Sequence, residues 1–80
     1  MIYAFVMLNV ETGSEENVLK HLRTLDIVEE AYVSYGVYDL IVKVKGKTME
    51  DLKEAVTRKI RATDQVSSTL TLVVTEEKPA

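Results

Sequence analysis

Val33-Ser-Tyr-Gly-Val-Tyr-Asp-Leu-Ile-Val-Lys-Val44 is the segment around which the rest of this chain can be arranged. It joins two strand-like runs, residues 31–35 and 38–44, which meet at a tight link that contains Gly36. Glycine adopts a positive φ without steric cost, so the chain can reverse direction at Gly36. From residue 40 to residue 44 every second side chain is apolar, which is typical of a strand. The segment therefore predicts a β-hairpin.

Length and composition indicate one small globular domain. We expect it to cover residues 1–75, with a polar tail at residues 76–80. Hydrophobic residues make up 46% of the chain and charged residues 29%, as in soluble proteins. The apolar start of the chain is too short to span a membrane, so we expect a cytoplasmic protein without membrane contact. The formal net charge of -3 argues against direct binding to DNA or RNA.

The first strand, predicted for residues 2–10, is apolar on both of its faces. One face carries alternating aliphatic residues, and the other carries Tyr3, Phe5 and Met7. A sheet that is covered on one side only should present polar residues on its other side. A chain of this length does not supply enough residues to cover both sides. We therefore expect Tyr3, Phe5 and Met7 to form a dimer interface.

Two amphipathic helices are predicted. Ser14 is a suitable N-cap for a helix that runs to about residue 25. Thr48 is the N-cap of the second helix, and Asp51 stands at its third position as in a capping box. The buried stripe of the second helix is predicted to hold Leu52, Ala55, Val56, Lys59 and Ile60. A last strand follows at residues 66–75.

The predicted order is strand, helix, strand, strand, helix, strand. This order is a βαβ unit used twice, and it defines an α+β ferredoxin-like βαββαβ sandwich. In that fold both helices lie on one face of a four-stranded antiparallel sheet. The first and third strands should be central, and the second and fourth strands should be at the edges.

No catalytic, metal-binding or cofactor-binding arrangement is visible in the sequence. His21 is the only histidine and there is no cysteine, so a His-based metal site or a Ser-His-Asp triad has no partners. The three glycines are isolated, which excludes a phosphate-binding Gly-rich loop. The third strand carries no aromatic residues on which RNA bases could stack. We therefore expect a protein that is not an enzyme.

Two polar groups remain as candidates for ligand binding. Asp39 directly follows the Gly36 turn, and hydroxyl side chains line the start of the last strand. The turn N–H groups could hold the carboxylate of an α-amino acid, while Asp39 takes its ammonium. The alternative is that Asp39 caps its own turn and that the serines and threonines are ordinary strand residues. The residues alone leave both interpretations open and favour this structural alternative.

The pattern Val33-x-x-Gly36-x-Tyr38-Asp39-Leu40, followed by a helix and Val66-x-x-Thr69-x-Thr71, resembles a known family. It is similar to the effector domain of Lrp/AsnC (feast/famine) transcription regulators, also called the RAM domain. The resemblance implies a ligand turn made by Tyr35, Gly36, Val37 and Asp39, with an opposing wall of Ser67, Ser68 and Thr69. It also implies dimers with facing sheets, assembly into tetramers or into octameric or decameric rings, and a small effector such as an amino acid.

Full regulators of this family begin with a helix-turn-helix domain, whereas here Met1 runs straight into the first strand. We therefore expect no direct DNA binding, and an effect on transcription through mixed assembly with full-length Lrp/AsnC regulators. Two alternatives stand beside this interpretation, and the first has the same chain order. One is an ACT-like regulatory domain that binds amino acids, and the other is a structural assembly subunit that binds no ligand.

Overall fold

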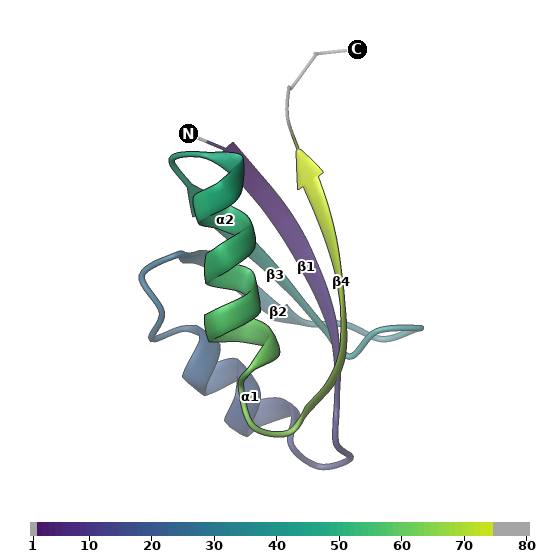
Figure 1. Ribbon diagram of the computed structural model, residues 1–80. Coiled ribbons are helices and arrows are strands. Elements are labelled where there is room, and N and C mark those ends of the chain that lie inside the picture. The colour runs from purple at the N-terminus through teal and green to yellow at the C-terminus, as the bar shows by residue number, and fades with distance from the viewer. Residues whose placement is uncertain (1, 75–80) are drawn as a thin grey trace.

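A computed structural model describes residues 2–74 of the chain. The elements follow one another as strand, helix, strand, strand, helix, strand (Figure 1). They are β1 (Ile2–Val10), α1 (Glu15–Leu22), β2 (Val28–Val33), β3 (Leu40–Gly46), α2 (Met49–Ala55), the π-helical turn η1 (Val56–Arg61) and β4 (Val66–Val74). η1 continues directly from α2, so the two form one helical segment.

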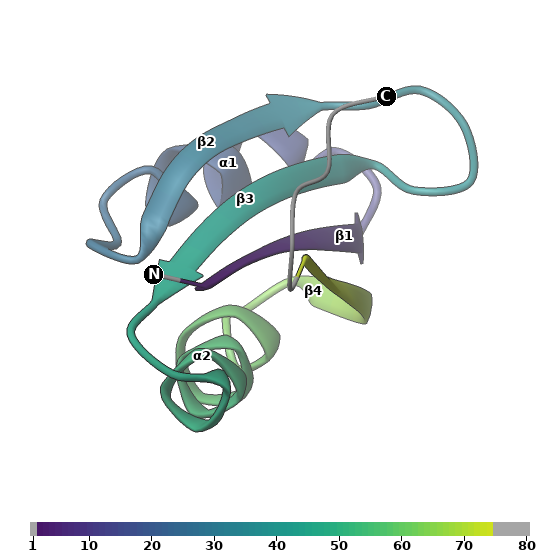
Figure 2. The ribbon, with the colours of Figure 1, turned by 90° about the horizontal axis from the view of Figure 1, so that it is seen from above.

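The four strands form one antiparallel sheet in the order β2-β3-β1-β4. This order confirms that the first and third strands are central and that the second and fourth are at the edges. Both helices lie on the same face of the curved sheet (Figure 2). The predicted α+β ferredoxin-like fold is therefore confirmed.

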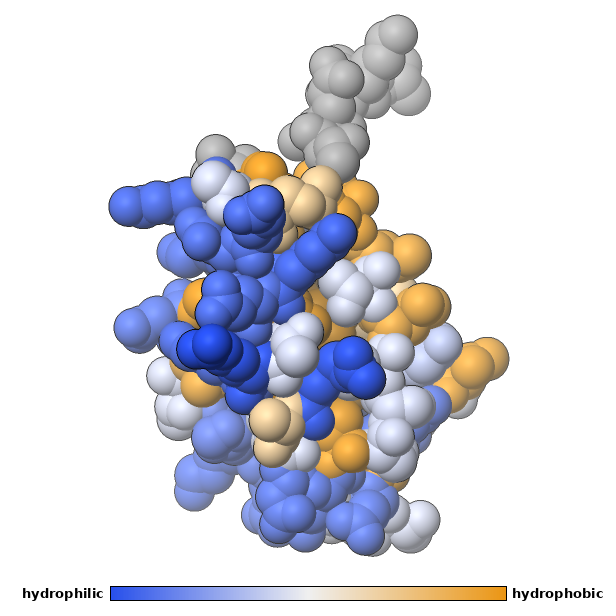
Figure 3. Space-filling model, in the orientation of Figure 1, coloured by the Kyte–Doolittle hydropathy of each residue, from blue (hydrophilic) through white to orange (hydrophobic). Residues whose placement is uncertain are grey.

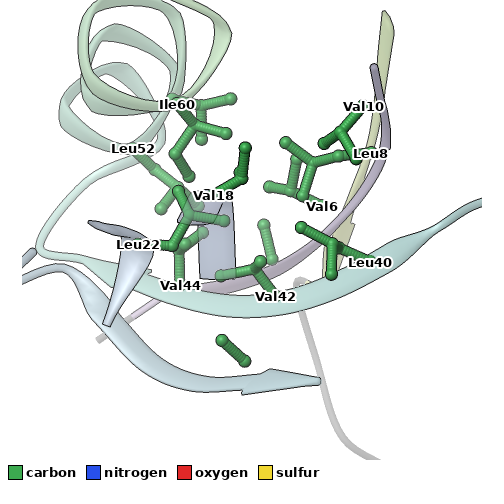
Figure 4. Close-up of a cluster of buried hydrophobic side chains, with 13 residues drawn as sticks. Val6, Leu8, Val10, Val18, Leu22, Leu40, Val42, Val44, Leu52 and Ile60 are labelled. Atoms are coloured by element: carbon green, nitrogen blue, oxygen red, sulfur yellow. The ribbon is translucent and has the colours of Figure 1, made fainter. Parts of the chain in front are cut away.

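The core lies between the sheet and the helices. Alternate residues of β1 and β3 point toward the helices and meet buried aliphatic side chains of α1, α2 and η1 (Figure 4). Full burial of one such side chain stabilises the fold by about 1.5–3 kcal/mol. The fully buried large side chains are Val6, Leu8, Val18, Leu22, Leu40, Val42, Val44, Leu52 and Ile60.

The link between β2 and β3 is longer than the sequence predicted. The expected strands at residues 31–35 and 38–44 with a tight link are wrong, because β2 ends at Val33 and β3 begins at Leu40. We call the intervening residues 34–39 the β2–β3 loop. Its base is closed by the Ser34 N–H, which donates to the Asp39 carbonyl at 2.8 Å. Gly36 has a φ of +148°, so the predicted positive φ is confirmed.

The first helix is shorter than predicted, since it ends at Leu22 and not near residue 25. Beyond Arg23 the backbone hydrogen bonds span three residues, as from the Thr24 N–H to the His21 carbonyl at 3.0 Å. The Thr24 hydroxyl donates to the same carbonyl at 2.6 Å and thereby competes with helix continuation. Ser14 occupies the predicted N-cap position, but its side chain makes no capping hydrogen bond.

The second helical segment begins as predicted and ends differently. The Thr48 hydroxyl accepts a hydrogen bond from the Asp51 N–H at 3.1 Å, which confirms the cap. Lys59 is exposed and does not belong to the buried stripe, because the π-helical turn rotates the side chains after Val56 away from the α-helical spacing. The predicted last strand is observed as far as Val74, and residues 75–80 lie outside the described residues.

Candidate functional site

The β2–β3 loop extends beyond the end of the sheet (Figure 2). The Tyr35 side chain is 97% exposed and that of Val37 is 83% exposed. Gly36 lies between them, and no heavy atom lies within 4 Å of the position where a Cβ would be. The tip of the loop therefore makes little contact with the rest of its own chain.

Asp39 is hydrogen-bonded to the end of β1. Its Oδ2 accepts a hydrogen bond from the Val10 N–H at 3.0 Å, and its own N–H donates to the Leu8 carbonyl at 2.9 Å. The pairing of β1 with β4 shifts register between Asn9 and Val10. The half-buried carboxylate thus satisfies a backbone N–H at an irregular point of the sheet.

An open hollow of about 360 Å³ lies between the start of α1 and the β2–β3 loop. We call it the acidic hollow, and it is lined by Glu15, Glu16, Val33, Ser34, Tyr35 and Asp39. Three carboxylates around one hollow favour a cationic group such as an ammonium. The structure therefore brings Tyr35 and Asp39 together, whereas Gly36 and Val37 are not among the lining residues.

A second hollow of about 300 Å³ lies at the start of β4. We call it the hydroxyl hollow, and it is lined by Arg61, Val66, Ser67, Ser68 and Thr69. The Ser67 hydroxyl donates to the Asn9 carbonyl at 3.0 Å, and the Asn9 amide donates to the Ser68 hydroxyl at 3.2 Å. The three predicted wall residues thus lie together.

The two hollows lie at the same end of the sheet but share no lining residue. Leu8 of β1 pairs with Leu40 on one side and with Thr69 on the other. Asp39 precedes Leu40, so two strand spacings, about 10 Å, separate its backbone from β4. The ammonium and carboxylate of one amino acid are much closer together than this. One chain therefore presents two separate groups of candidate residues and not a single pocket.

Arg61 is a residue that the sequence analysis missed. In the sequence it is one of several basic residues at the end of an amphipathic helix. The sequence carries no signal that would single it out. Its position against Ser67, Ser68 and Thr69 depends on the π-helical turn and on the packing of this turn near β4.

The sheet face that lies opposite the helices is rich in exposed apolar side chains. Phe5 is 38% exposed, and its cross-strand partner Leu72 is 51% exposed. The predicted interface residues Tyr3, Phe5 and Met7 lie on this face, and β4 adds residues that the sequence analysis did not name. We call the following set the outer-face patch: Tyr3, Phe5, Met7, Ile41, Leu70, Leu72 and Val74.

The surface over the helices is mostly hydrophilic, and hydrophobic surface appears along the side that β4 occupies (Figure 3). On the other side of the outer face, charged residues border the outer-face patch. The Lys43 ammonium lies 4.8 Å from the centre of the Tyr3 ring and 4.0 Å from a Glu30 carboxylate oxygen. The Tyr32 hydroxyl donates to Glu30 at 2.5 Å, and this hydrogen bond raises the pKa of the Tyr32 phenol.

Within residues 2–74, no group of three or more His, Cys, Asp or Glu side chains is placed to hold a metal ion. Over the same residues, no helix has the length and apolar character needed to cross a membrane.

The fold and the two hollows define a small α+β domain with candidate ligand-binding surfaces. Residues 3–79 match the family described as the Lrp/AsnC ligand binding domain. The chain therefore belongs to this family of regulatory ligand-binding domains. The match supports the Lrp/AsnC resemblance over the ACT-like alternative.

The regulatory protein AsnC of Haemophilus influenzae is 38% identical over 58 residues, which are 72% of this chain and 39% of that protein. The chain thus spans about two fifths of the length of the AsnC relatives that it matches.

Solved structures show the same fold. TTHA0845 from Thermus thermophilus is 31% identical with a TM-score of 0.93, and the match covers 100% of both chains. The hypothetical protein PHS023 from Pyrococcus horikoshii is 40% identical with a TM-score of 0.89, over 96% of this chain and 93% of that one. The regulator NMB0573 from Neisseria meningitidis, solved as a complex with L-Met, is 15% identical with a TM-score of 0.86, over 99% of this chain and 53% of that one. At this identity it shows the fold alone.

Proposed function

We propose that this domain senses a small effector, an amino acid, and couples its binding to assembly. The observation that carries this proposal is the pair of hollows at one end of the sheet. The acidic hollow suits the ammonium of an amino acid, with Asp39 as its principal partner. Ser67, Ser68 and Thr69 offer hydroxyl donors for the polar end of the same ligand. The L-Met complex of NMB0573 shows that a protein with this fold was solved with an amino acid.

The separation of the two hollows within one chain has a consequence for this proposal. An amino acid held by both groups of residues requires the acidic hollow of one copy to face the hydroxyl hollow of another. The exposed loop residues Tyr35 and Val37 would then contact the neighbouring copy. Effector binding and assembly would be linked, because each stabilises the arrangement that the other needs.

Assembly forms the second part of the proposal. The outer-face patch presents aromatic and aliphatic side chains in a contiguous group, which is typical of an interface. We propose a dimer with facing sheets and, from the family resemblance, a tetramer or a larger ring of dimers. We further propose a cytoplasmic domain that modulates transcription together with full-length Lrp/AsnC regulators, without direct contacts to DNA.

The ligand-free assembly subunit remains a second candidate, and one observation favours it. Asp39 already has a structural role, because its Oδ2 satisfies the Val10 N–H. This hydrogen bond alone is a sufficient reason for an aspartate at position 39, whether or not a ligand binds.

Calorimetric titration of the purified protein with each of the twenty amino acids tests the proposal, together with its mass in solution. We expect one or a few amino acids to bind and to shift the assembly state. An assembly that binds none of them would support the ligand-free subunit. A protein that is monomeric at all concentrations would contradict the assembly part.

A further inference from the structure

The hydroxyl hollow continues into a larger hollow between the second helical segment and β4. This larger hollow has a volume of about 430 Å³, within the range of small-molecule sites. Figure 2 shows the helical segment and β4 next to each other along this side of the molecule. Arg61 and Thr69 line both hollows, so we call the two together the Arg61 groove. The larger hollow is lined by Lys53, Val56, Thr57, Arg61, Thr69, Thr71 and Val73.

The groove exists because the helical segment covers β4 incompletely. Val56 and Ile60 are buried in the core, while Thr69, Thr71 and Val73, on the helix-facing side of β4, are only half-buried. The segment changes from α-helix to π-helix at Val56, and short π-helical turns occur often at functional sites.

The chemistry of the groove suits an anion. Two cationic side chains, Lys53 and Arg61, line it, and none of its lining residues is acidic. The ion pairs found within residues 2–74 join Lys43 to Glu30 and Arg58 to Glu54, so neither uses Arg61. A guanidinium binds a carboxylate through two parallel N–H···O bonds.

Hydroxyl groups add hydrogen-bond donors beside the guanidinium. Thr69 and Thr71 are close to valine in shape, but each carries a hydroxyl that can donate and accept hydrogen bonds. Their hydroxyls have no hydrogen-bond partner among the described residues. Val56 and Val73 provide an apolar wall on which a hydrocarbon chain can pack.

We propose that the Arg61 groove binds the carboxylate of a small organic acid, with Arg61 as its anchor. This inference rests on the proposed function for its choice of ligand, the α-carboxylate of an amino-acid effector. In that role Arg61 takes the carboxylate, and the apolar wall contacts the side chain of the ligand. A carboxylate without an amino group has the same anchoring chemistry.

The test compares the parent protein with Arg61→Gln and with the control Arg58→Gln. Arg58 belongs to the same helical turn but pairs with Glu54 at 3.1 Å and lines neither hollow. The probes are the twenty amino acids by calorimetry, and 4-methylpentanoate and 3-methylbutylamine by NMR. These last two are leucine without its amino group and leucine without its carboxylate. Because Arg58 and Arg61 are both exposed and the surface ion pair of Arg58 contributes little, both variants should unfold close to the temperature of the parent.

For every amino acid that the parent binds, we expect Arg61→Gln to lower the affinity by about 10- to 100-fold. This is the loss expected for one hydrogen bond to a charged group. Arg58→Gln should bind as the parent does. 4-Methylpentanoate should shift the amide signals of residues 67–71 in the parent but not in Arg61→Gln. 3-Methylbutylamine should leave these signals unchanged in both proteins. Equal amino-acid affinity in Arg61→Gln and the parent would overturn the inference.

If no amino acid binds the parent, the proposed sensing function fails and the NMR titration decides the inference alone. Amide shifts with 4-methylpentanoate that require Arg61 would then support a carboxylate site for another acid. Absence of these shifts in the parent, or equal shifts in Arg61→Gln, would contradict the proposed carboxylate site.

Discussion

Asp39 has two candidate roles that share one carboxylate. Oδ2 accepts the Val10 N–H from a strand that lies 29 residues earlier in the chain. The same carboxylate lines the acidic hollow together with Glu15 and Glu16. A structural role and a ligand role are therefore compatible in the geometry. Substitutions that keep or remove the acceptor can separate them.

Asp39→Ala should lower the free energy of unfolding by about 1–3 kcal/mol, because it leaves the Val10 N–H without its acceptor. Asp39→Asn keeps a carbonyl oxygen at that position and should cost less, while it loses the charge that an ammonium requires. Urea unfolding at pH 7 measures the first effect and calorimetry the second. Asp26→Ala is the control, because Asp26 is exposed and its side chain has no hydrogen bond or ion pair within residues 2–74. An Asp39→Ala variant as stable as the parent would show that the bond contributes nothing.

Gly36 tests the conformation of the β2–β3 loop. Gly36→Val should destabilise the fold by about 1–3 kcal/mol through the backbone alone, because a φ of +148° is unfavourable for a β-branched residue. A steric clash does not contribute, since nothing lies within 4 Å of the added Cβ. Thermal unfolding measures the change. Val37→Ala, in the same loop, is the control and should change the free energy of unfolding by less than about 0.5 kcal/mol. A Gly36→Val protein with the stability of the parent would mean that the loop relaxes into another conformation.

At the scale of elements, the two helices both have a hydroxyl residue at the N-cap, but only one of these side chains makes a capping hydrogen bond. Thr48 and Ser14 both occupy N-cap positions, and only Thr48 accepts a hydrogen bond from the first helical turn. Residue type at an N-cap position therefore does not establish that a cap has formed. The dihedral angles decide, since Thr48 is extended whereas Ser14 has a ψ of 1°.

Thr48→Ala should lower the free energy of unfolding by about 1 kcal/mol, because it removes the acceptor of the Asp51 N–H. Ser14→Ala is the matched comparison and should cost clearly less, since no capping bond is lost there. Urea unfolding of both variants gives the difference. Equal losses for both would contradict the assignment of the cap to Thr48 alone.

At the scale of the whole molecule, the sheet has one covered face and one uncovered face. The helices bury the even-numbered residues of β1, and the outer-face patch is left on the opposite side. No helix within residues 2–74 lies on that side. A second copy of the domain is the simplest cover for it.

Phe5→Glu should dissociate the proposed dimer, because a carboxylate placed in an apolar interface lacks a partner and loses its hydration. Leu72→Glu, at the cross-strand partner of Phe5, should act in the same way. Both variants should stay folded, since neither residue belongs to the buried core. Sedimentation velocity measures the assembly, with Lys20→Glu on the exposed side of α1 as the charge control. Variants that sediment as the parent does would exclude the facing-sheet dimer.

The sequence by itself determined the class of fold, the order of the elements and the two faces of the sheet. These follow from period-two and helical spacing of apolar residues, which are local signals. It also indicated the Thr48 cap and the positive φ of Gly36, since both depend on one residue type at one position. The predicted interface residues Tyr3, Phe5 and Met7 came from the same alternation along β1.

Only the tertiary structure decided the length of the β2–β3 loop, the bond from Val10 to Asp39 and the position of Arg61 beside β4. Each of these depends on which segments pack together across long stretches of chain, and no local pattern encodes this. The end of α1 at Leu22 likewise follows from the Thr24 hydroxyl, which competes with the regular helix for the His21 carbonyl. The candidate ligand residues fall into two separate hollows for the same physical reason, because β1 lies between β3 and β4 in the sheet.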